Sequence, residues 1–416
     1  MRSWNENLKK WAIVLTIVFL LPAVWLLVAG STSRRRIDAK WLLKDFQRVE
    51  EMIGEHVDPY WRTPKEGFEE VIEKARSSIK RMHRMDFYLV AQKVMALLQD
   101  HESYVHFGMP DYMPVLPFKL RFRDGKLFVY DSIDGEVKDG SVVEEFNGMG
   151  IEKLLNWVGE YVGGESEEQF LRLAEDFLFK YPSIFRKESV KVKIGGRVVK
   201  VYCISIAKYS ERLKEKKKSR DFELVRIRGV PILKLRTLSL WGQDIQDFED
   251  TLEDLSKEKV VVLDLRGNGG GSWKTAQTVM KYLSRGKLEL EREITMKGEG
   301  SRKDALEFEG GNFKGKLYVL VDRRTLDEAY DLVLMLSSFA KIVGEEPGIE
   351  DFRFGFPAYK RLPSVGMFLT VSRGRIEYDG RLRIDVKMEE DFQSYVDRMT
   401  GRRDAVIEKL LKEVIM

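Results

Sequence analysis

The chain has 416 residues, of which 33% are charged and 44% are hydrophobic, a balance typical of a folded protein with room for more than one domain. Its 71 basic and 67 acidic residues leave a net charge of +4, and they are spread along the chain, so no nucleic-acid partner is expected. A single cysteine, Cys203, excludes an internal disulfide and a multi-cysteine metal site.

The N-terminal segment Trp11–Ala29 contains 19 residues without a charge. As a helix it would reach roughly 28 Å, close to the thickness of the hydrocarbon core of a bilayer. Residues 1–37 are therefore predicted to be a membrane anchor with its flanks, which implies a single-pass membrane protein. A cleaved signal peptide is the alternative, because small residues follow Val28, but the length of the apolar run favours an anchor.

Two regions with different periodicity follow the anchor. Residues 38–110 carry apolar positions at three- and four-residue spacing and are predicted to be a helical region. Residues 111–206 alternate with a period of two around the turn signals Asp124-Gly125 and Gly195-Gly196, which predicts a small β-rich unit with hairpins. Residues 207–220 are a charged run and are interpreted as a solvated connector.

Residues 221–416 alternate between strand and helix patterns, which predicts an α/β core with a largely parallel sheet. Strands are expected at 230–238, 259–266, 316–321 and 341–345, and helices at 244–257, 274–283 and 328–339. A strand hairpin and a closing helix are expected at the C-terminal end.

The segment Val260–Gly271, VVVLDLRGNGGG, places a glycine-rich turn directly after a buried strand. Such a turn lets backbone N–H groups converge on an anion, although a tight turn without any ligand has the same pattern. It is not a dinucleotide fingerprint, because Ser272 stands where the last glycine is needed. It is not a phosphate loop either, because Trp273 precedes Lys274.

The same segment resembles the signature of the tail-specific, or C-terminal processing, serine peptidases, a family that includes tricorn-like proteases and interphotoreceptor retinoid-binding proteins. Leu97–Phe107 resembles the family's "D-x-H-T" segment, and Lys316–Leu336 resembles its strand, "T-x-S-x-x-E" turn and helix. The resemblance implies a ClpP/crotonase-like α/β core, a PDZ-like unit at residues 111–206, polypeptide substrates and a soluble domain outside the cytoplasm.

The resemblance also implies site residues, and three positions depart from the family. The serine position is Asp327, the glutamate position is Tyr330, and Gly344–Glu350 has no lysine to act as the base. His101 remains as a candidate base. The implied oxyanion donors are the backbone N–H groups of Gly269, Gly270, Gly271 and Glu328. The implied supporting residues are Asp100, Asp264, Arg266, Asn268 and Thr325.

A carboxylate cannot replace the serine in acyl transfer, because it would form an anhydride and starts out negative where negative charge must later be stabilised. We therefore predict a polypeptide-binding protein that has lost peptidase activity, with no cofactor and no metal. One alternative is a hydrolase with His101 as base and Asp327 orienting water, which a separation beyond about 8 Å would exclude. Another is a carrier of small apolar ligands, as in the retinoid-binding branch. In the plainest interpretation, Asp327 only caps its helix and His101 is structural.

Overall fold

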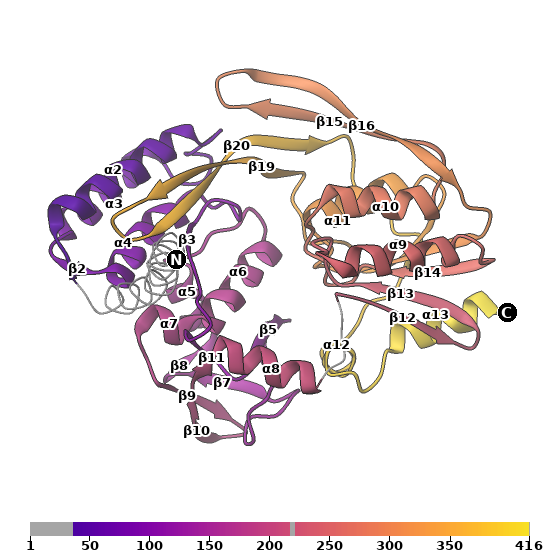
Figure 1. Ribbon diagram of the computed structural model, residues 1–416, viewed down its shortest axis with the longest axis horizontal. Coiled ribbons are helices and arrows are strands. Elements are labelled where there is room, and N and C mark those ends of the chain that lie inside the picture. Colours follow the sequence, from indigo (N-terminus) through magenta and orange to yellow (C-terminus); the bar gives the residue numbers. More distant parts are fainter. Residues whose placement is uncertain (1–35, 217–220, 416) are drawn as a thin grey trace, which may run out of the picture.

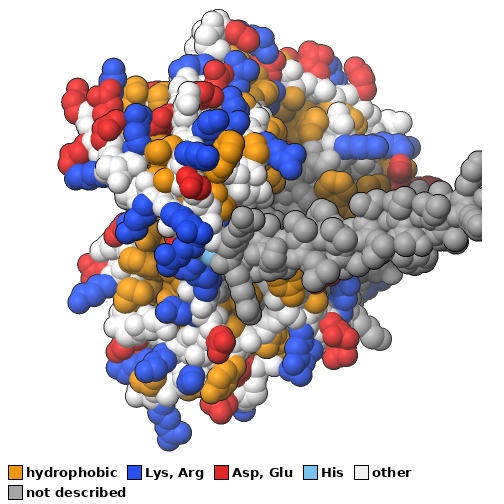
Figure 2. Space-filling view, turned by 60° about the vertical axis from the view of Figure 1, so that its left-hand side comes forward, with side chains coloured by type: hydrophobic (Ala, Val, Ile, Leu, Met, Phe, Trp, Pro, Cys, Tyr) orange, Lys and Arg blue, Asp and Glu red, His pale blue; other side chains and the backbone are white. Residues whose placement is uncertain are grey.

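A computed structural model describes residues 36–216 and 221–415. Figure 1 shows the N-terminal half and the C-terminal half as two bodies, joined along the top by long antiparallel strands. Acidic and basic side chains are interspersed over the face in Figure 2, as the balanced composition predicts. The predicted anchor Trp11–Ala29 lies outside the described residues, and among these residues no helix has both the length and the apolarity to cross a membrane.

The helical region predicted after the anchor is confirmed. Its helices are α2 (Ala39–Glu55), α3 (Lys65–Ser78) and α4 (Arg84–Ala96). The apolar face of α2, with Leu42, Phe46 and Val49, is buried at the expected helical spacing. The short strands β1 (Arg36–Ile37) and β2 (Met82–His83) pair antiparallel and hold the start of α2 beside the start of α4.

The β-rich unit contains the predicted hairpins. Its sheet has the order β10-β9-β7-β6-β5, and β8 pairs with β7. These strands are β5 (Lys119–Arg123), β6 (Lys126–Tyr130), β7 (Val142–Phe146), β8 (Met149–Gly150), β9 (Ser189–Ile194) and β10 (Arg197–Tyr202). Its helices are α5 (Ile151–Val158), α6 (Glu167–Phe179) and α7 (Tyr181–Phe185). The PDZ-like assignment and the predicted domain boundaries stay predictions.

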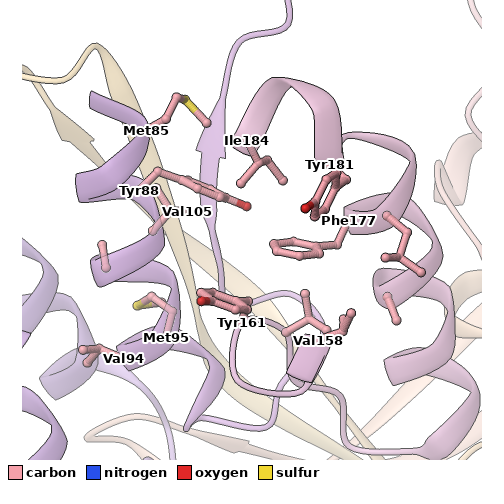
Figure 3. Packing of buried hydrophobic residues seen from close by; sticks show 14 of the residues in the cluster. Met85, Tyr88, Val94, Met95, Val105, Val158, Tyr161, Phe177, Tyr181 and Ile184 are labelled. Atoms are coloured by element: carbon pink, nitrogen blue, oxygen red, sulfur yellow. The ribbon is translucent and has the colours of Figure 1, made fainter. Parts of the chain in front are cut away.

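The helices of these two regions share one apolar core. Figure 3 shows Met85, Tyr88 and Met95 of α4 facing Tyr161 and Phe177 across it. Because the core is continuous, α6 is held at a fixed position relative to the end of α4. This placement matters because both segments carry residues of the candidate site.

The predicted connector is partly wrong. Residues Ile206–Lys216 form the helix α8, and its preceding strand β11 (Ile204–Ser205) pairs with β4 (Pro114–Val115). Tyr209 is buried and donates a hydrogen bond to the carbonyl of Asp131. The sequence did not indicate this helix, because most of its residues are charged and one buried aromatic residue, Tyr209, decides which face packs.

The α/β core has the predicted parallel sheet, in the order β12-β13-β14-β17-β18-β21. Only the edge strand β12 runs antiparallel to its neighbour. The strands are β12 (Phe222–Ile227), β13 (Val230–Leu235), β14 (Val260–Asp264), β17 (Lys316–Val321), β18 (Lys341–Gly344) and β21 (Val386–Lys387). The helices are α9 (Gln243–Leu255), α10 (Trp273–Leu283), α11 (Asp327–Leu336), α12 (Phe392–Met399) and α13 (Ala405–Ile415).

Helices cover both faces of this sheet, as a parallel sheet requires. Val261 and Leu263 of β14 point to the core formed with α9, α10 and α11. Val262, between them, packs on the other face with Ile407 and Leu410 of α13. The alternation of side chains along one strand therefore serves two separate cores.

A second, antiparallel sheet joins the two bodies, in the order β16-β15-β20-β19. Its strands are β15 (Arg285–Met296), β16 (Gly300–Asn312), β19 (Phe352–Leu362) and β20 (Met367–Tyr378). The strand β3 (Val105–Phe107), which follows the helical region, pairs with β20, with Val105 opposite Leu369. Because of this pairing, the segment that contains His101 is fixed to the sheet that joins the two bodies.

Candidate active site

The turn between β17 and α11 presents Asp327 at the first residue of the helix. Thr325 fixes this turn, because its hydroxyl donates to the carbonyl of Leu265 and accepts from the N–H of Asp322. Asp327 itself has a φ of 53°, the left-handed region that a non-glycine residue rarely adopts. Reactive side chains are often presented by a residue with a strained backbone at the turn from a strand to a helix.

The interpretation of Asp327 as a helix cap is wrong. The residue that precedes the helix is Leu326, and no side chain caps this end. The Asp327 carboxylate lies 3.2 Å from the Nε2 atom of His101 and accepts from Arg172 at 3.2 Å and from Gln169 at 3.2 Å. Its partners come from other parts of the chain, which local sequence cannot show.

His101 lies between two carboxylates. Its Nδ1 atom is 2.7 Å from a carboxylate oxygen of Glu165, and its Nε2 atom faces Asp327. Glu165 also accepts from the backbone N–H of His101 at 3.1 Å and from Gln169 at 3.2 Å. His101, Glu165 and Asp327 are all buried, so water screens these charges weakly.

This arrangement holds a proton on His101. Burial alone would lower the pKa of His101, but the charges of Asp327 and Glu165 outweigh it and raise the pKa well above its usual value. For Asp327, burial alone would raise the pKa, but the His101 imidazolium and then Arg172 hold it well below its usual range. Both shifts favour an ion pair between the Asp327 carboxylate and the His101 imidazolium.

The glycine loop after β14 packs directly against the start of α11. A Cβ atom on Gly270, which has a φ of 90°, would lie 2.7 Å from the Cβ of Asp327, so only glycine fits there. Asn268 holds the loop, since its side chain donates to the carbonyl of Leu235 and accepts from the N–H of Gly270. The loop also receives a hydrogen bond from Arg172, at the carbonyl of Gly269.

Two of the four N–H groups predicted to bind an oxyanion, those of Gly270 and Gly271, already have acceptors. The N–H of Gly271 donates to the side-chain carboxylate of Glu328 at 2.9 Å, and that of Gly270 donates to Asn268. Glu328 was predicted to contribute its backbone, yet its carboxylate takes the place of a bound anion. The protein therefore places one of its own negative charges on the glycine loop.

Three of the predicted supporting residues lie away from the cavity, in buried networks. Asp264 and Arg266 pair at 2.7 Å, and Arg266 also binds Asp404 at 2.6 Å. Asp100 contacts His56 at 3.2 Å and the hydroxyl of Ser103. These residues stabilise the segments that carry the site.

The site opens into a cavity of about 310 Å³. The predicted residues His101, Gly269, Gly271, Asp327 and Glu328 line it, and Glu102, Tyr104 and Tyr359 join them. Glu102 has a buried carboxylate oxygen without a hydrogen-bond partner, and burial raises its pKa to about 7.

The sequence reasoning missed Glu102, Glu165, Gln169 and Arg172. One signal precedes Glu165, because a Cβ on Gly163 or Gly164 would come within 2.8 Å or 2.6 Å of neighbouring backbone. These glycines let residues 163–165 approach α4 and α6 closely. Two consecutive glycines indicate that the backbone passes close to another segment, but they do not indicate which residues that segment contains.

Among the described residues, Asp100, His101 and Glu165 bring possible metal-ligand atoms within 4.8 Å of one another. These atoms are already engaged, since His101 binds Glu165 and Asp100 binds His56 and Ser103. An ion would have to displace the His101 proton and several hydrogen bonds, so the cluster fits a proton better than a metal.

Comparisons with known proteins confirm the family resemblance. Residues 230–350 match the model of peptidase family S41. No curated protein sequence matches the chain significantly. The solved structure of mature CPAF complexed with lactacystin is similar with a TM-score of 0.66 and 13% identity, over 91% of this chain and 99% of that chain. The photosystem II D1 C-terminal processing protease gives a TM-score of 0.49 and 17% identity, over 88% and 98% of the two chains. The likeness to CPAF shows the α/β protease fold.

Proposed function

Starting from a chain whose residues 230–350 match peptidase family S41, we propose a membrane-anchored protein that binds polypeptide segments in its cleft without cleaving them. The observation that carries this proposal is the position of His101 between two buried carboxylates, 2.7 Å from Glu165 and 3.2 Å from Asp327. An imidazolium whose two nitrogen atoms both face carboxylates has no lone pair left to act as a general base.

Two further features support the loss of serine chemistry. Asp327 stands where the family resemblance implies the nucleophile, and a carboxylate gives no stable acyl intermediate. Glu328 occupies the Gly271 N–H that an oxyanion would need. The nucleophile position is therefore replaced, the candidate base faces two carboxylates, and one of the predicted oxyanion donors is occupied by a group of the protein itself.

The cavity keeps features suited to a polypeptide. Tyr104, Pro357 and Tyr359 line it with apolar surface, and the Tyr359 side chain is 67% exposed. Arg172, 45% exposed, stands beside them with its guanidinium on Asp327. Exposed aromatic surface next to a few fixed polar groups is typical of sites that bind side chains of a partner chain.

The test uses full-length protein and a fluorescent peptide library, with binding followed by anisotropy and cleavage by mass spectrometry. We expect binding without cleavage, and weaker binding in Tyr359→Ala. Tyr202→Ala is the matched control, since Tyr202 is a 64% exposed tyrosine on β10 that does not line the cavity. Turnover that disappears in His101→Ala would overturn the proposal.

An active hydrolase remains a second candidate, because His101 and Asp327 are 3.2 Å apart, far inside the separation that would exclude it. In that case the roles reverse: Asp327 would be the base that orients water and the His101 imidazolium the acid. Asp327→Asn would then abolish turnover. An apolar-ligand carrier is disfavoured, since the cavity is lined by His101, Glu102, Arg172, Asp327 and Glu328.

Membrane attachment through Trp11–Ala29, with the soluble part outside the cytoplasm, is part of the proposal. Alkaline carbonate extraction of membranes tests the attachment, because a spanning segment stays in the pellet. Digestion of sealed vesicles with an added protease tests the orientation. Release into the supernatant would favour the cleaved signal peptide.

A further inference from the structure

A second cavity lies at the base of the helical region, where the described chain begins. It has a volume of about 760 Å³, and β1, β2 and the starts of α2 and α4 meet beside it. Its polar and aromatic lining residues include Arg36, Asp38, Trp41, Arg81, Arg84 and Ser364. None of these residues belongs to the cleft described above.

The three arginines of this cavity form none of the ion pairs found among the described residues. The Nε atom of Arg84 is buried without a hydrogen-bond partner, and burial lowers the pKa of this guanidinium. The carboxylate of Asp38 accepts the backbone N–H of Lys40 at the start of α2. Burying an arginine without a counter-ion destabilises the folded protein, unless a bound anion neutralises the guanidinium.

The surroundings match a membrane interface. Trp41 is 47% exposed, and the ammonium groups of Lys40 and Lys44 lie 5.2 Å and 4.8 Å from its ring centre. An exposed tryptophan beside lysines is typical of surfaces at the level of lipid headgroups, where the ring is amphipathic and the amines meet phosphates.

The sequence ties this cavity to the predicted anchor. Arg36 follows Ala29, the last residue of the apolar segment, by seven positions. A fully extended chain of that length spans at most about 25 Å. The pairing of Arg36 with His83 then places Arg36 next to Arg81 and Arg84. The cavity is therefore held within reach of the headgroup layer on whichever side the protein lies.

We propose that this cavity binds the phosphate of an anionic phospholipid headgroup, with Arg36, Arg81 and Arg84 as its ligands. The proposal rests on the membrane attachment proposed above and is separate from the peptide cleft. Guanidinium groups bind phosphate oxygens in pairs of hydrogen bonds, so three of them around one cavity select an anionic headgroup over a zwitterionic one.

The experiment titrates full-length protein in zwitterionic detergent with short-chain phosphatidylglycerol, phosphatidylcholine or inorganic phosphate, and follows bound lipid by native mass spectrometry. We compare Arg36→Gln with Arg81→Gln as a double variant, and Arg84→Gln alone. The two outer arginines are exposed, so their removal leaves the fold intact even where Arg84→Gln does not. The matched control is Arg302→Gln with Lys303→Gln, two exposed cations on β16.

The expected result is preferential binding of phosphatidylglycerol, weakened about thirtyfold in the double variant, which corresponds to ~1 kcal/mol for each arginine. The control variant binds as the wild type does. Equal binding by the wild type and the double variant would overturn the proposal. Inorganic phosphate binding as tightly as the lipid would also overturn it, in favour of free phosphate. Carbonate extraction separately tests the anchor, so a failed anchor and a failed lipid site give different results.

Discussion

Replacing Asp327 with asparagine tests the central electrostatic argument. The change removes one negative charge 3.2 Å from the Nε2 atom of His101 and keeps the size of the side chain. With an effective dielectric constant of about 20, that charge is worth ~5 kcal/mol to the imidazolium, an upper value because the site can relax. The pKa of His101 should therefore fall, while the charge of Glu165 still keeps it from falling further.

The assay is an NMR titration of full-length protein labelled with ¹³C at histidine Cε1, and four histidines keep the spectrum simple. His106 gives an internal reference, because burial lowers its pKa to about 4. In the wild type, His101 should stay protonated well above pH 6.5, the usual pKa of histidine. The control Asp331→Asn removes a buried carboxylate from the same helix that pairs with Arg353, so His101 should titrate as in the wild type. A wild-type His101 that titrates near pH 6.5 would refute the reasoning.

The same pair predicts how stability depends on pH. The folded pKa of His101 is raised, so its stabilisation is complete below about pH 6.5 and is lost as the pH rises through the folded pKa. The folded pKa of Asp327 is lowered, so its stabilisation is present above about pH 4 and is lost as the pH falls. Asp327→Asn should therefore reduce the free energy of unfolding most between about pH 4 and 6.5.

Three other changes test the surroundings of the site. Burial raises the pKa of Glu102 to about 7, so the ionised carboxylate destabilises the folded protein at higher pH. Glu102→Gln should therefore be more stable than the wild type by up to ~3 kcal/mol above pH 7 and equally stable below about pH 4.5. Urea unfolding at both pH values measures the difference. Glu345→Gln breaks a buried bidentate pair with Arg123 (2.6 and 2.9 Å) and should cost ~3–5 kcal/mol in the same assay. Gly270→Ala should cost at least ~2 kcal/mol, because the new Cβ would meet Asp327 at 2.7 Å, whereas Gly196→Ala in an open turn should cost ~1 kcal/mol.

Each of these predictions has a contradicting outcome. A stability difference for Glu102→Gln that does not change between the two pH values would mean that its carboxyl titrates normally. Little loss in Glu345→Gln would mean that water enters the Arg123 pair. Equal losses at the two glycines would mean that backbone strain alone, and not the contact with α11, requires glycine in the loop after β14.

The sequence by itself determined the architecture of the core. Strand and helix periodicities located β13, β14, β17, β18 and the helices between them, because burial on both faces of a parallel sheet leaves a clear apolar pattern. The glycine segment carried the resemblance to the tail-specific peptidases, and residues 230–350 match the model of peptidase family S41. The long hairpin of β15 and β16 was not predicted, although Leu288 and Leu290 on one strand and Leu306 and Phe308 on the other alternate with charged residues, the pattern of a half-buried strand.

Only the tertiary structure decided what surrounds His101. Glu165 is 64 positions away from it and Asp327 is 158 positions from Gln169, so no local pattern links them. The pairing of β3 with β20 and the shared core of α4 and α6 bring these side chains together. Asp327 looked like a helix cap because capping is a local interaction, whereas an ion pair across the cleft depends on contacts that form only when the chain is folded.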